Sequence, residues 1–478
     1  MKVTFIVAPY NIIADCYGAE ESKTGKADYG YWLPLGPGFL ASSAIQAGHK
    51  AEIIDCGPNG YSYDDVKRIL KQSKPDAIGV SANIAIKNQS TTLVQSLKDD
   101  FDVPIFMGGS LATTFPSNAL KDNPHLSFIL RGEAEKTIPE VLNKLEKGHS
   151  LKDVPGIGYR ENGNIIVTEP REPTKNLDEL PPPAWQLYDI PIYKSLPLQT
   201  LKHPAVPYLS SRGCPYARCT FCFEGGIAAP KYRRHSVERV INDIKILVEK
   251  HNVKEVAFWD DIFFVNQDWF LEFCKRFKEE KIDIPWQGLG YINSITNKMI
   301  EAAGKSGCWN IGIGYESGSI DVLNQIKKAT SLDKTKEVTK TIHQNGITTR
   351  GFFVVGLPGD TPERTMQTVK FAIDMDLTFA QFNTFFPEYG TEDYFDAVKR
   401  GMISEDYTTR TSSIYVPEGY KDSNEVSRTA AIAYNKFYMR PRYFLKHGIR
   451  ALMHPSAIPN YFDGLRYILG VAFNTKNI

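Results

Sequence analysis

The chain has 478 residues, enough for two or three domains, and its 42% hydrophobic and 23% charged residues are ordinary for a globular protein. The net charge of +1 argues against general nucleic-acid binding, which usually needs a clear basic excess. No apolar run approaches the ~20 residues of a membrane span, and the apolar start of the chain is too short for a signal peptide. Four of the seven cysteines are dispersed along the chain, which suits a reducing compartment. We therefore expect a cytoplasmic protein without a transmembrane segment.

Residues 1–150 alternate short apolar runs with segments of helical periodicity. This alternation predicts a doubly wound parallel sheet, whose ligands bind beyond the carboxyl ends of the strands. No GxGxxG follows the first strand, so a dinucleotide site is a poor interpretation. Strands are expected at 3–8, 51–55, 77–81, 105–108 and 128–130, and helices at 38–47, 63–71, 90–99 and 137–147. The residues predicted at the ligand edge are Ser81, Ala82, Asn83, Gly108, Gly109, Ser110, Gly132, Glu133 and Glu135.

Residues 151–204 read as a linker between two domains. Asn162-Gly163 lies between two short apolar runs and predicts a β-hairpin turn. Three consecutive prolines at 181–183 then predict a semi-rigid spacer that ends regular structure. Nothing in this segment carries catalytic chemistry, so a structural role is expected.

Three cysteines, Cys214, Cys219 and Cys222, follow a short apolar run that predicts a buried strand. Three thiolates on one loop can bind three irons of a cuboidal iron–sulfur cluster and leave the fourth iron open to a chelating substrate. The alternative is a structural zinc site, which requires four ligands, usually arranged as two pairs in the sequence. No second pair exists here, and His203 is the nearby candidate for a fourth ligand. A disulfide framework does not suit a chain this long.

Strand–helix alternation resumes over residues 205–400 and predicts a partial parallel barrel, with its active site at the carboxyl ends of the strands. Asp260 and Asp261 follow the second strand, although Asp261 could simply cap the next segment. Ser236 is a predicted helix N-cap, and the basic residues before it are either solvated or bind an anion. Strands are expected at 206–210, 255–259, 286–290, 310–315, 349–356 and 380–385, and helices at 237–250, 267–278, 297–305, 320–326, 333–345 and 362–375.

Residues 401–478 are expected to form a helical C-terminal region, with helices at 426–438 and 443–453. Basic and aromatic side chains interleave there without an intervening acid. One interpretation is ordinary helix packing with extended basic side chains. The other is a cap over the substrate opening, or a patch facing lipid or an acidic substrate. The residues concerned are Tyr434, Lys436, Phe437, Tyr438, Arg440, Arg442, Tyr443, Phe444, Lys446 and Arg450.

The cysteine loop, with Phe221 directly before its last cysteine, resembles that of the radical S-adenosylmethionine (SAM) enzymes. The family spacing is CxxxCxxC, and this chain has one more residue between Cys214 and Cys219, which a loop can absorb. Four motifs at the ends of later predicted strands, at 258–263, 312–319, 351–360 and 385–391, also resemble those of the family. The resemblance implies that a [4Fe-4S] cluster is held by the three cysteines and that SAM is bound by Phe221, Asp260, Asp261, Glu316, Ser317, Gly356 and Leu357.

The first 150 residues resemble the cobalamin-binding domain that precedes many radical SAM cores. The matching features are Pro34-Leu35-Gly36, Gly48-His49, Asp55, Gly108-Gly109 and 132–135. The resemblance implies cobalamin contacts from Leu35, Gly36 and the nine edge residues named above. The DxHxxG motif that supplies an axial histidine in methionine-synthase-type domains is absent.

Taken together, the chain resembles a cobalamin-dependent radical SAM methyltransferase acting on an unactivated carbon of a small molecule or lipid. The resemblance implies cleavage of SAM to a 5′-deoxyadenosyl radical, hydrogen abstraction from the substrate and methyl transfer from methylcobalamin. It also implies a low-potential electron donor such as flavodoxin or ferredoxin, and it assigns no catalytic residue beyond the cluster ligands. One alternative is a radical SAM cyclase or ring-rearranging enzyme without methyl transfer. Another is a cobalamin- or metal-binding regulator without turnover.

Overall fold

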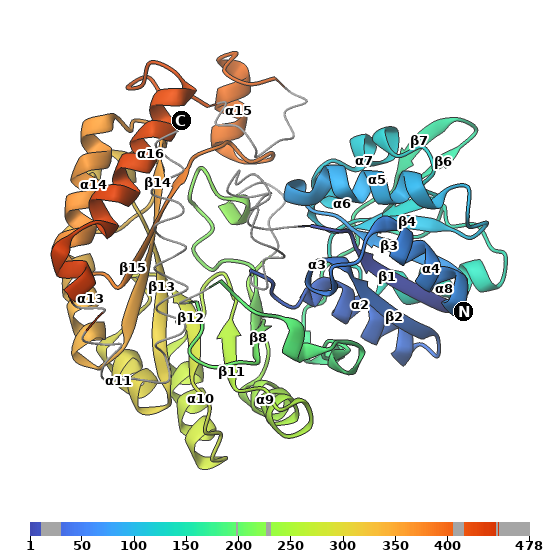
Figure 1. The fold of residues 1–478 in the computed structure, drawn as a ribbon, viewed down its shortest axis with the longest axis horizontal. Helices are drawn as coiled ribbons and strands as arrows, with labels where there is room; N and C mark the ends of the chain where they lie inside the picture. The colour runs from blue at the N-terminus through green and yellow to red at the C-terminus, as the bar shows by residue number, and fades with distance from the viewer. Residues whose placement is uncertain (11–29, 197–198, 226–230, 405–414, 446–447, 449–478) are drawn as a thin grey trace. The chain divides into compact units, whose positions relative to one another are not determined.

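The computed structural model describes residues 1–10, 30–196, 199–225, 231–404, 415–445 and 448 (Figure 1). The chain divides into two compact units, Met1–Ser195 and Leu196–Ile478. Each unit is built around its own sheet. Among the described residues, no helix is long and apolar enough to cross a membrane.

The first unit holds a seven-stranded sheet in the order β2-β1-β3-β4-β5-β6-β7. Strands β1 to β5 pair in parallel, which confirms the predicted doubly wound sheet. The five parallel strands are β1 (Lys2–Val7), β2 (Lys50–Asp55), β3 (Ala77–Ser81), β4 (Ile105–Gly108) and β5 (Phe128–Leu130). The helices are α2 (Leu35–Gln46), α3 (Cys56–Asn59), α4 (Tyr63–Ser73), α5 (Lys87–Leu97), α6 (Ser110–Thr114), α7 (Pro116–Asp122) and α8 (Thr137–Glu146).

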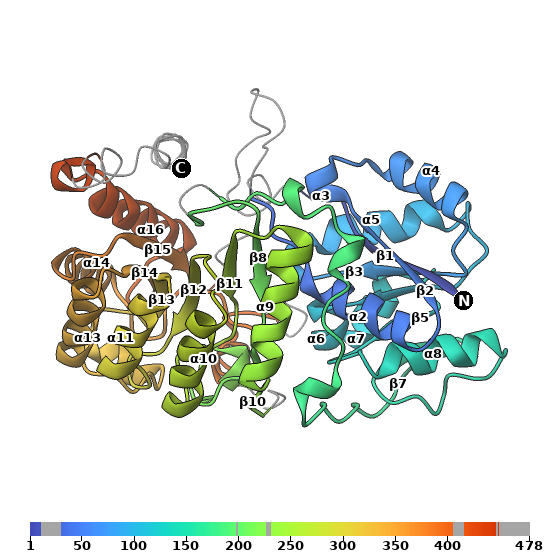
Figure 2. The same cartoon turned by 90° about the horizontal axis from the view of Figure 1, so that it is seen from below.

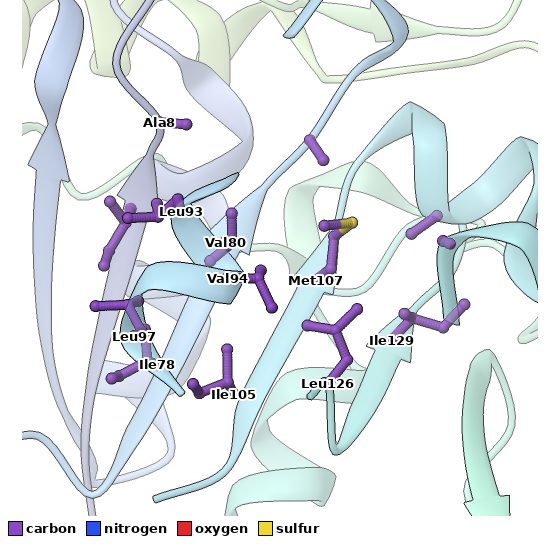
Figure 3. Packing of buried hydrophobic residues seen from close by; sticks show 14 of the residues in the cluster. Ala8, Ile78, Val80, Leu93, Val94, Leu97, Ile105, Met107, Leu126 and Ile129 are labelled. Carbon is purple, nitrogen blue, oxygen red and sulfur yellow. The ribbon is translucent and has the colours of Figure 1, made fainter. Parts of the chain in front are cut away.

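Alternate residues of these strands enter two separate cores, one on each face of the sheet. Figure 3 shows one of them, where Leu93, Val94 and Leu97 of α5 pack over Ile78 of β3 and Ile105 of β4. On the opposite face, apolar residues of β1, β4 and β5 pack with α8. Because both faces are covered, these strands are nearly continuous apolar runs in the sequence.

The predicted hairpin forms and extends this sheet. Its strands are β6 (Ile157–Glu161) and β7 (Asn164–Val167), and β6 pairs antiparallel with β5. Asn162 and Gly163 have φ of 50° and 81°, as a two-residue hairpin turn requires. The first unit therefore continues past residue 150 to Ser195. The segment after the prolines is bound to this unit as well, since the Tyr188 hydroxyl donates to the Pro34 carbonyl at 2.6 Å.

The second unit holds six parallel strands in the order β15-β14-β13-β12-β11-β8, which form the predicted half-barrel. Figure 2 shows the helices α9, α10, α11 and α13 along its outer side. The strands are β8 (Ala205–Tyr208), β11 (Glu255–Phe258), β12 (Trp286–Gly290), β13 (Cys308–Glu316), β14 (Thr348–Val355) and β15 (Phe379–Thr384). The helices are α9 (Val237–His251), α10 (Gln267–Glu279), α11 (Asn297–Lys305), α12 (Ile320–Gln325), α13 (Leu332–Gln344), α14 (Pro362–Asp374), α15 (Glu392–Lys399) and α16 (Ser423–Tyr438).

Side-chain caps fix where the helices of the half-barrel begin. Each capping oxygen accepts a hydrogen bond from a backbone N–H in the first helical turn, which satisfies a group without an intrahelical partner. Ser236 caps α9 as predicted. The other caps are Asn266 for α10, Thr296 for α11, Ser331 for α13, Thr361 for α14 and Thr391 for α15.

Helix α16 packs against β15, with the rings of Phe437 and Phe382 6.0 Å apart and the Tyr438 hydroxyl donating to the Ala380 carbonyl at 2.8 Å. These contacts agree with the packing interpretation for the aromatic residues of α16. Most of the second predicted C-terminal helix, at 443–453, falls on residues outside the described part of the chain.

Candidate functional site

The three cysteines of the loop after β8 line one cavity of about 280 Å³ at the carboxyl ends of β11, β12 and β13. We call it the cluster cavity. Three residues predicted to bind SAM, Phe221, Asp261 and Glu316, lie in the same wall. The half-barrel therefore gathers the loop and distant strand ends at one place, as expected for a parallel barrel.

The extra residue in the cysteine spacing is absorbed in a local turn. Ala217 has φ of 43°, and its N–H lies 3.5 Å from the Cys214 sulfur, so the backbone folds back toward the first cysteine. Next to it, the Tyr216 hydroxyl donates to the Lys327 carbonyl at 2.6 Å and accepts from the Ala329 N–H at 3.1 Å. The longer loop is thereby bound to the segment after α12.

Thr220, between the second and third cysteines, holds the far side of the loop. Its N–H donates to the Ile326 carbonyl at 3.2 Å, and its hydroxyl donates to the Asp393 carboxylate at 3.1 Å. In the opposite direction, the Asp393 N–H donates a hydrogen bond to the Thr220 carbonyl at 3.1 Å. These bonds fix the backbone between Cys219 and Cys222 against α12 and α15.

Burial raises the pKa of both the Cys219 and Cys222 thiols to about 11. Coordination to a metal deprotonates such thiols, so the donor set fits an iron–sulfur cluster held by three thiolates. Among the described residues, no three cysteine, histidine or acidic side chains are grouped as ligands of a single metal ion. His203, the candidate fourth zinc ligand, precedes β8, whereas the cysteines follow that strand, and its Nε2 lies 3.0 Å from the Thr200 hydroxyl.

Asp260 and Asp261 are consecutive but occupy different environments. Asp260 has no exposed surface and accepts hydrogen bonds from the Ser210 hydroxyl at 2.8 Å and from the Ser211 hydroxyl. It therefore holds the end of β8, from which the cysteine loop departs. Asp261 lines the cluster cavity and accepts from the Gly213 N–H. Burial raises the pKa of the Asp260 carboxyl; partial loss of solvation and the neighbouring Asp260 charge raise that of Asp261, whose side chain stays exposed.

Glu316 forms an ion pair with Lys328, whose Nζ lies 3.0 Å from its Oε1. Both side chains line the cluster cavity, and Lys328 also lies 5.3 Å from the ring of Tyr291. Burial lowers the pKa of Lys328, but attraction to Glu316 and Cys219 outweighs this and raises it overall. Glu316 has φ of 62° where the register between β13 and β14 shifts, which turns its side chain toward the lysine.

Sequence reasoning did not identify Lys328 or Tyr216. Lys328 follows α12, and no local pattern separates it from the exposed Lys327 beside it. The remaining expected SAM contacts lie elsewhere. Ser317 is 3% exposed, with its hydroxyl 3.2 Å from that of Thr368. Gly356 and Leu357 do not appear in the cavity wall formed by the described residues, since Leu357 is fully buried in a core cluster.

In the first unit, the expected cobalamin contacts gather at the carboxyl edge of the sheet. The Ala82 N–H donates to the Gly108 carbonyl at 2.8 Å, and the Leu111 N–H donates to the Ala82 carbonyl at 3.3 Å, which joins the loops after β3 and β4. Gly109 has φ of 106°, and a Cβ there would lie 2.4 Å from the Ala82 oxygen. Asn83 accepts from the Ile86 N–H at 3.1 Å and so orders the β3 loop.

Two other expected contact positions at this edge border open space. A Cβ added at Gly36, at the start of α2, or at Gly132, after β5, would meet no atom within 4 Å. Ser110 begins α6, and Glu135 is 8% exposed. Asp55 at the end of β2 accepts from the Tyr193 hydroxyl at 3.1 Å, and burial raises its pKa to about 7. An open edge with backbone groups and few bulky side chains fits a large planar ligand.

Comparison with known proteins finds a family match in each of the two units. Residues 208–372 match the radical SAM superfamily, and residues 25–142 match the B12 binding domain. An uncharacterised methyltransferase of Pyrococcus horikoshii is 31% identical over 86% of this chain and 89% of its own length. An anaerobic magnesium-protoporphyrin IX monomethyl ester cyclase of Rubrivivax gelatinosus is 27% identical over 75% of this chain and 65% of its own.

A solved structure of this kind of enzyme has the same fold as this chain. The chain superposes on the radical SAM methyltransferase TsrM from Kitasatospora setae, solved with cobalamin and a [4Fe-4S] cluster, with a TM-score of 0.68. The superposition covers 90% of this chain and 88% of TsrM at 14% sequence identity. It confirms the arrangement of a cobalamin-type sheet followed by a half-barrel.

Proposed function

Because this chain belongs to the cobalamin-dependent radical SAM enzymes, we propose that it transfers a methyl group to an unactivated carbon of a small molecule or lipid. The observation that carries the proposal is the convergence of three cysteine thiols, three carboxylates and one ammonium on the cluster cavity. When bound, the cluster, SAM and cobalamin supply the radical chemistry and the methyl group.

The residues of the cluster cavity suit the charged end of SAM. The Asp261 and Glu316 carboxylates can accept hydrogen bonds from an amino group, and Lys328 can donate to a carboxylate. Phe221 supplies an apolar face beside the cysteines. Asp260 acts indirectly, because it accepts hydrogen bonds from Ser210 and Ser211 at the base of the cysteine loop.

In the first unit, we propose that Leu35, Gly36 and the loops after β3, β4 and β5 hold cobalamin. Support comes from the open space at Gly36 and Gly132 and from the close approach of Gly109 to Ala82. A Gly36→Leu variant should fold as the parent does, because a Cβ at this position has no other atom within 4 Å. It should bind less cobalamin, because the side chain occupies the open edge.

The test is anaerobic reconstitution with iron, sulfide and cobalamin, followed by metal analysis and turnover with SAM labelled in its methyl group. We expect about four irons and one cobalt per chain, and we expect label in a product. Single Cys→Ala changes at the three loop positions should abolish iron binding, whereas Cys274→Ala, a buried cysteine of α10, should not. Four irons without cobalt, or one zinc in place of iron, would contradict the proposal.

Product analysis separates the alternatives. Formation of 5′-deoxyadenosine without a methylated product would favour the cyclase or ring-rearranging function, which the resemblance to the Rubrivivax cyclase makes the second candidate. No SAM cleavage under strong reduction, with both cofactors bound, would favour a regulator without turnover.

The reaction also needs an electron from outside the chain, and we propose a flavodoxin or ferredoxin as its source.

Contact with a membrane surface and a cytoplasmic location stay predictions. Part of the basic and aromatic C-terminal segment lies outside the described residues, while Phe444 and Leu445 within them are 37% and 66% exposed. Binding of the full chain to anionic vesicles, compared with neutral ones, would test the contact.

A further inference from the structure

Arg234, one of the basic residues before the α9 cap, points its guanidinium at protein groups. It ends β10 (Arg233–Arg234), a short strand that pairs antiparallel with β9 (Ser211–Arg212) at the start of the cysteine loop. Its half-buried side chain lies over the ring of Trp269 on α10, with the guanidinium carbon 4.2 Å from the ring centroid. The attraction between a cation and an indole face helps to fix the orientation of the guanidinium.

The Arg234 guanidinium binds the backbone of residues 259–266, the segment between β11 and α10, which we call the β11 loop. Its Nη1 donates to the Val265 carbonyl at 2.9 Å, and its Nη2 donates to the Phe263 carbonyl at 2.8 Å. Nη2 also donates to the Ile262 carbonyl at 3.4 Å. Hydrogen bonds from an ionised donor are stronger than those between neutral groups. One side chain from β10 therefore fixes three carbonyls of the β11 loop.

The same cation also stabilises Asp260, at the start of the β11 loop. Asp260 has no exposed surface, and its carboxylate accepts hydrogen bonds from the hydroxyls of Ser210 and Ser211. Burial lowers the pKa of Arg234, and the negative charge of Asp260 offsets part of that effect. In the same way, the charge of Arg234 opposes the burial that raises the pKa of Asp260. The guanidinium therefore links the base of the cysteine loop to the β11 loop.

Asp261 lies between these two groups of contacts. Two positions after it, Phe263 is fully buried, and its N–H donates to the Leu289 carbonyl at 2.8 Å. Asp261 itself lines the cluster cavity and accepts from the Gly213 N–H of the cysteine loop. Among the described residues that form the wall of this cavity, Arg234 is absent. Any effect of Arg234 on a molecule in the cluster cavity must therefore pass through the β11 loop.

We propose that Arg234 is a positioning residue for SAM, because it fixes where the Asp261 carboxylate lies in the cluster cavity. The inference rests on the proposed function, in which Asp261 accepts a hydrogen bond from the amino group of SAM. Without the guanidinium, the three loop carbonyls lose their donor, and the carboxylate is no longer fixed opposite that amino group. The cysteines should be less affected, because Tyr216 and Thr220 fix their loop through separate hydrogen bonds.

The test measures the dissociation constant for SAM by equilibrium dialysis with the anaerobically reconstituted full chain, without a reductant, so that no SAM is cleaved. Arg234→Gln should weaken binding by about tenfold or more, since small misplacements of a binding group have effects of this size. Arg234→Lys should recover part of the loss, because lysine keeps the charge near Asp260 but lacks the fork of donors. Iron content and the absorption spectrum of the cluster should stay those of the parent in both variants.

A double variant tests whether Arg234 acts through Asp261. Asp261→Asn alone should weaken SAM binding, and adding Arg234→Lys should then have little further effect, because both changes act on one contact. The matched control is Arg276→Gln on α10, an arginine paired with Glu280 at 3.2 Å, which should bind SAM as the parent does.

Hydrogen exchange on the cluster-free chain gives a readout that needs no cofactor. The Phe263 amide and its neighbours in the β11 loop should exchange faster in Arg234→Gln than in the parent, because the loop opens more often. Peptides from β13, which Arg234 does not contact, should exchange at the parent rate and serve as the internal control.

Unchanged SAM binding in both Arg234 variants would overturn the inference, and so would unchanged binding in Asp261→Asn. Losses that simply add in the double variant would show that Arg234 does not act through Asp261. Loss of iron from both Arg234 variants would show a general structural role instead. If Arg234→Gln does not fold, Arg234→Lys provides the test. A parent chain that binds neither iron nor cobalt refutes the proposed function, whereas normal cofactor content with any of the results above refutes this inference alone.

Discussion

Replacing Lys328 with methionine is expected to destabilise the second unit by about 3 kcal/mol. The side chains of Lys328 and Glu316 are 12% and 10% exposed and meet at 3.0 Å, so the substitution removes the cation from a largely buried carboxylate. Removal of one partner from a buried ion pair costs about 3–5 kcal/mol. We expect the lower end of that range, because the pair lines a cavity of about 280 Å³ in which water can solvate the remaining charge.

The neighbouring residue supplies a matched control. Lys327 pairs with Glu392 at 2.6 Å, but these side chains are 55% and 62% exposed, so Lys327→Met should cost less than about 1 kcal/mol. Urea unfolding followed by tryptophan fluorescence measures the difference. Four of the six tryptophans report on the second unit: Trp259, Trp269, Trp286 and Trp309.

The double variant Glu316→Gln/Lys328→Met should recover part of the lost stability, because it removes the isolated carboxylate as well. Equal losses for Lys327→Met and Lys328→Met would refute the reasoning, as would a double variant that is no more stable than Lys328→Met. The comparison is made on cluster-free protein, so that a change in cluster binding does not enter the measured free energy.

Three further predictions concern single positions. Burial raises the pKa of Glu255 from 4.5 to about 7, so the folded state binds its proton more tightly, and stability should fall by up to about 3 kcal/mol between pH 4.5 and 7. Urea midpoints across that range should show this slope in the parent and lose it in Glu255→Gln; an unchanged slope would exclude Glu255 as its source. Gly109→Ala should lower the thermal midpoint and cobalamin binding, since its Cβ would overlap the Ala82 carbonyl, whereas Gly36→Ala should leave the thermal midpoint unchanged. Gly163→Ala should cost about 1 kcal/mol because φ is 81° there, and an unaltered urea midpoint would speak against the turn geometry.

The sequence by itself determined where the regular elements lie. Strands buried on both faces leave continuous apolar runs, and helices leave a 3.6-residue period, so β3, β4 and β5 coincide with their predicted bounds. Helix caps and turns can also be predicted from the local sequence: Ser236 caps α9, and Asn162-Gly163 forms the hairpin turn. The three cysteines are close in sequence, so a common site required no knowledge of the fold.

The tertiary structure alone decided which distant residues share a wall. Asp260 and Asp261 differ by one position, yet one is held by Ser210 and Ser211 while the other lines the cluster cavity. Lys328 reaches Glu316 only because α12 returns the chain to the end of β13. Pairing of β6 with β5 likewise placed the expected linker hairpin in the first sheet. These outcomes depend on strand order and on contacts between residues far apart in the chain, and neither leaves a periodic signal in the local sequence.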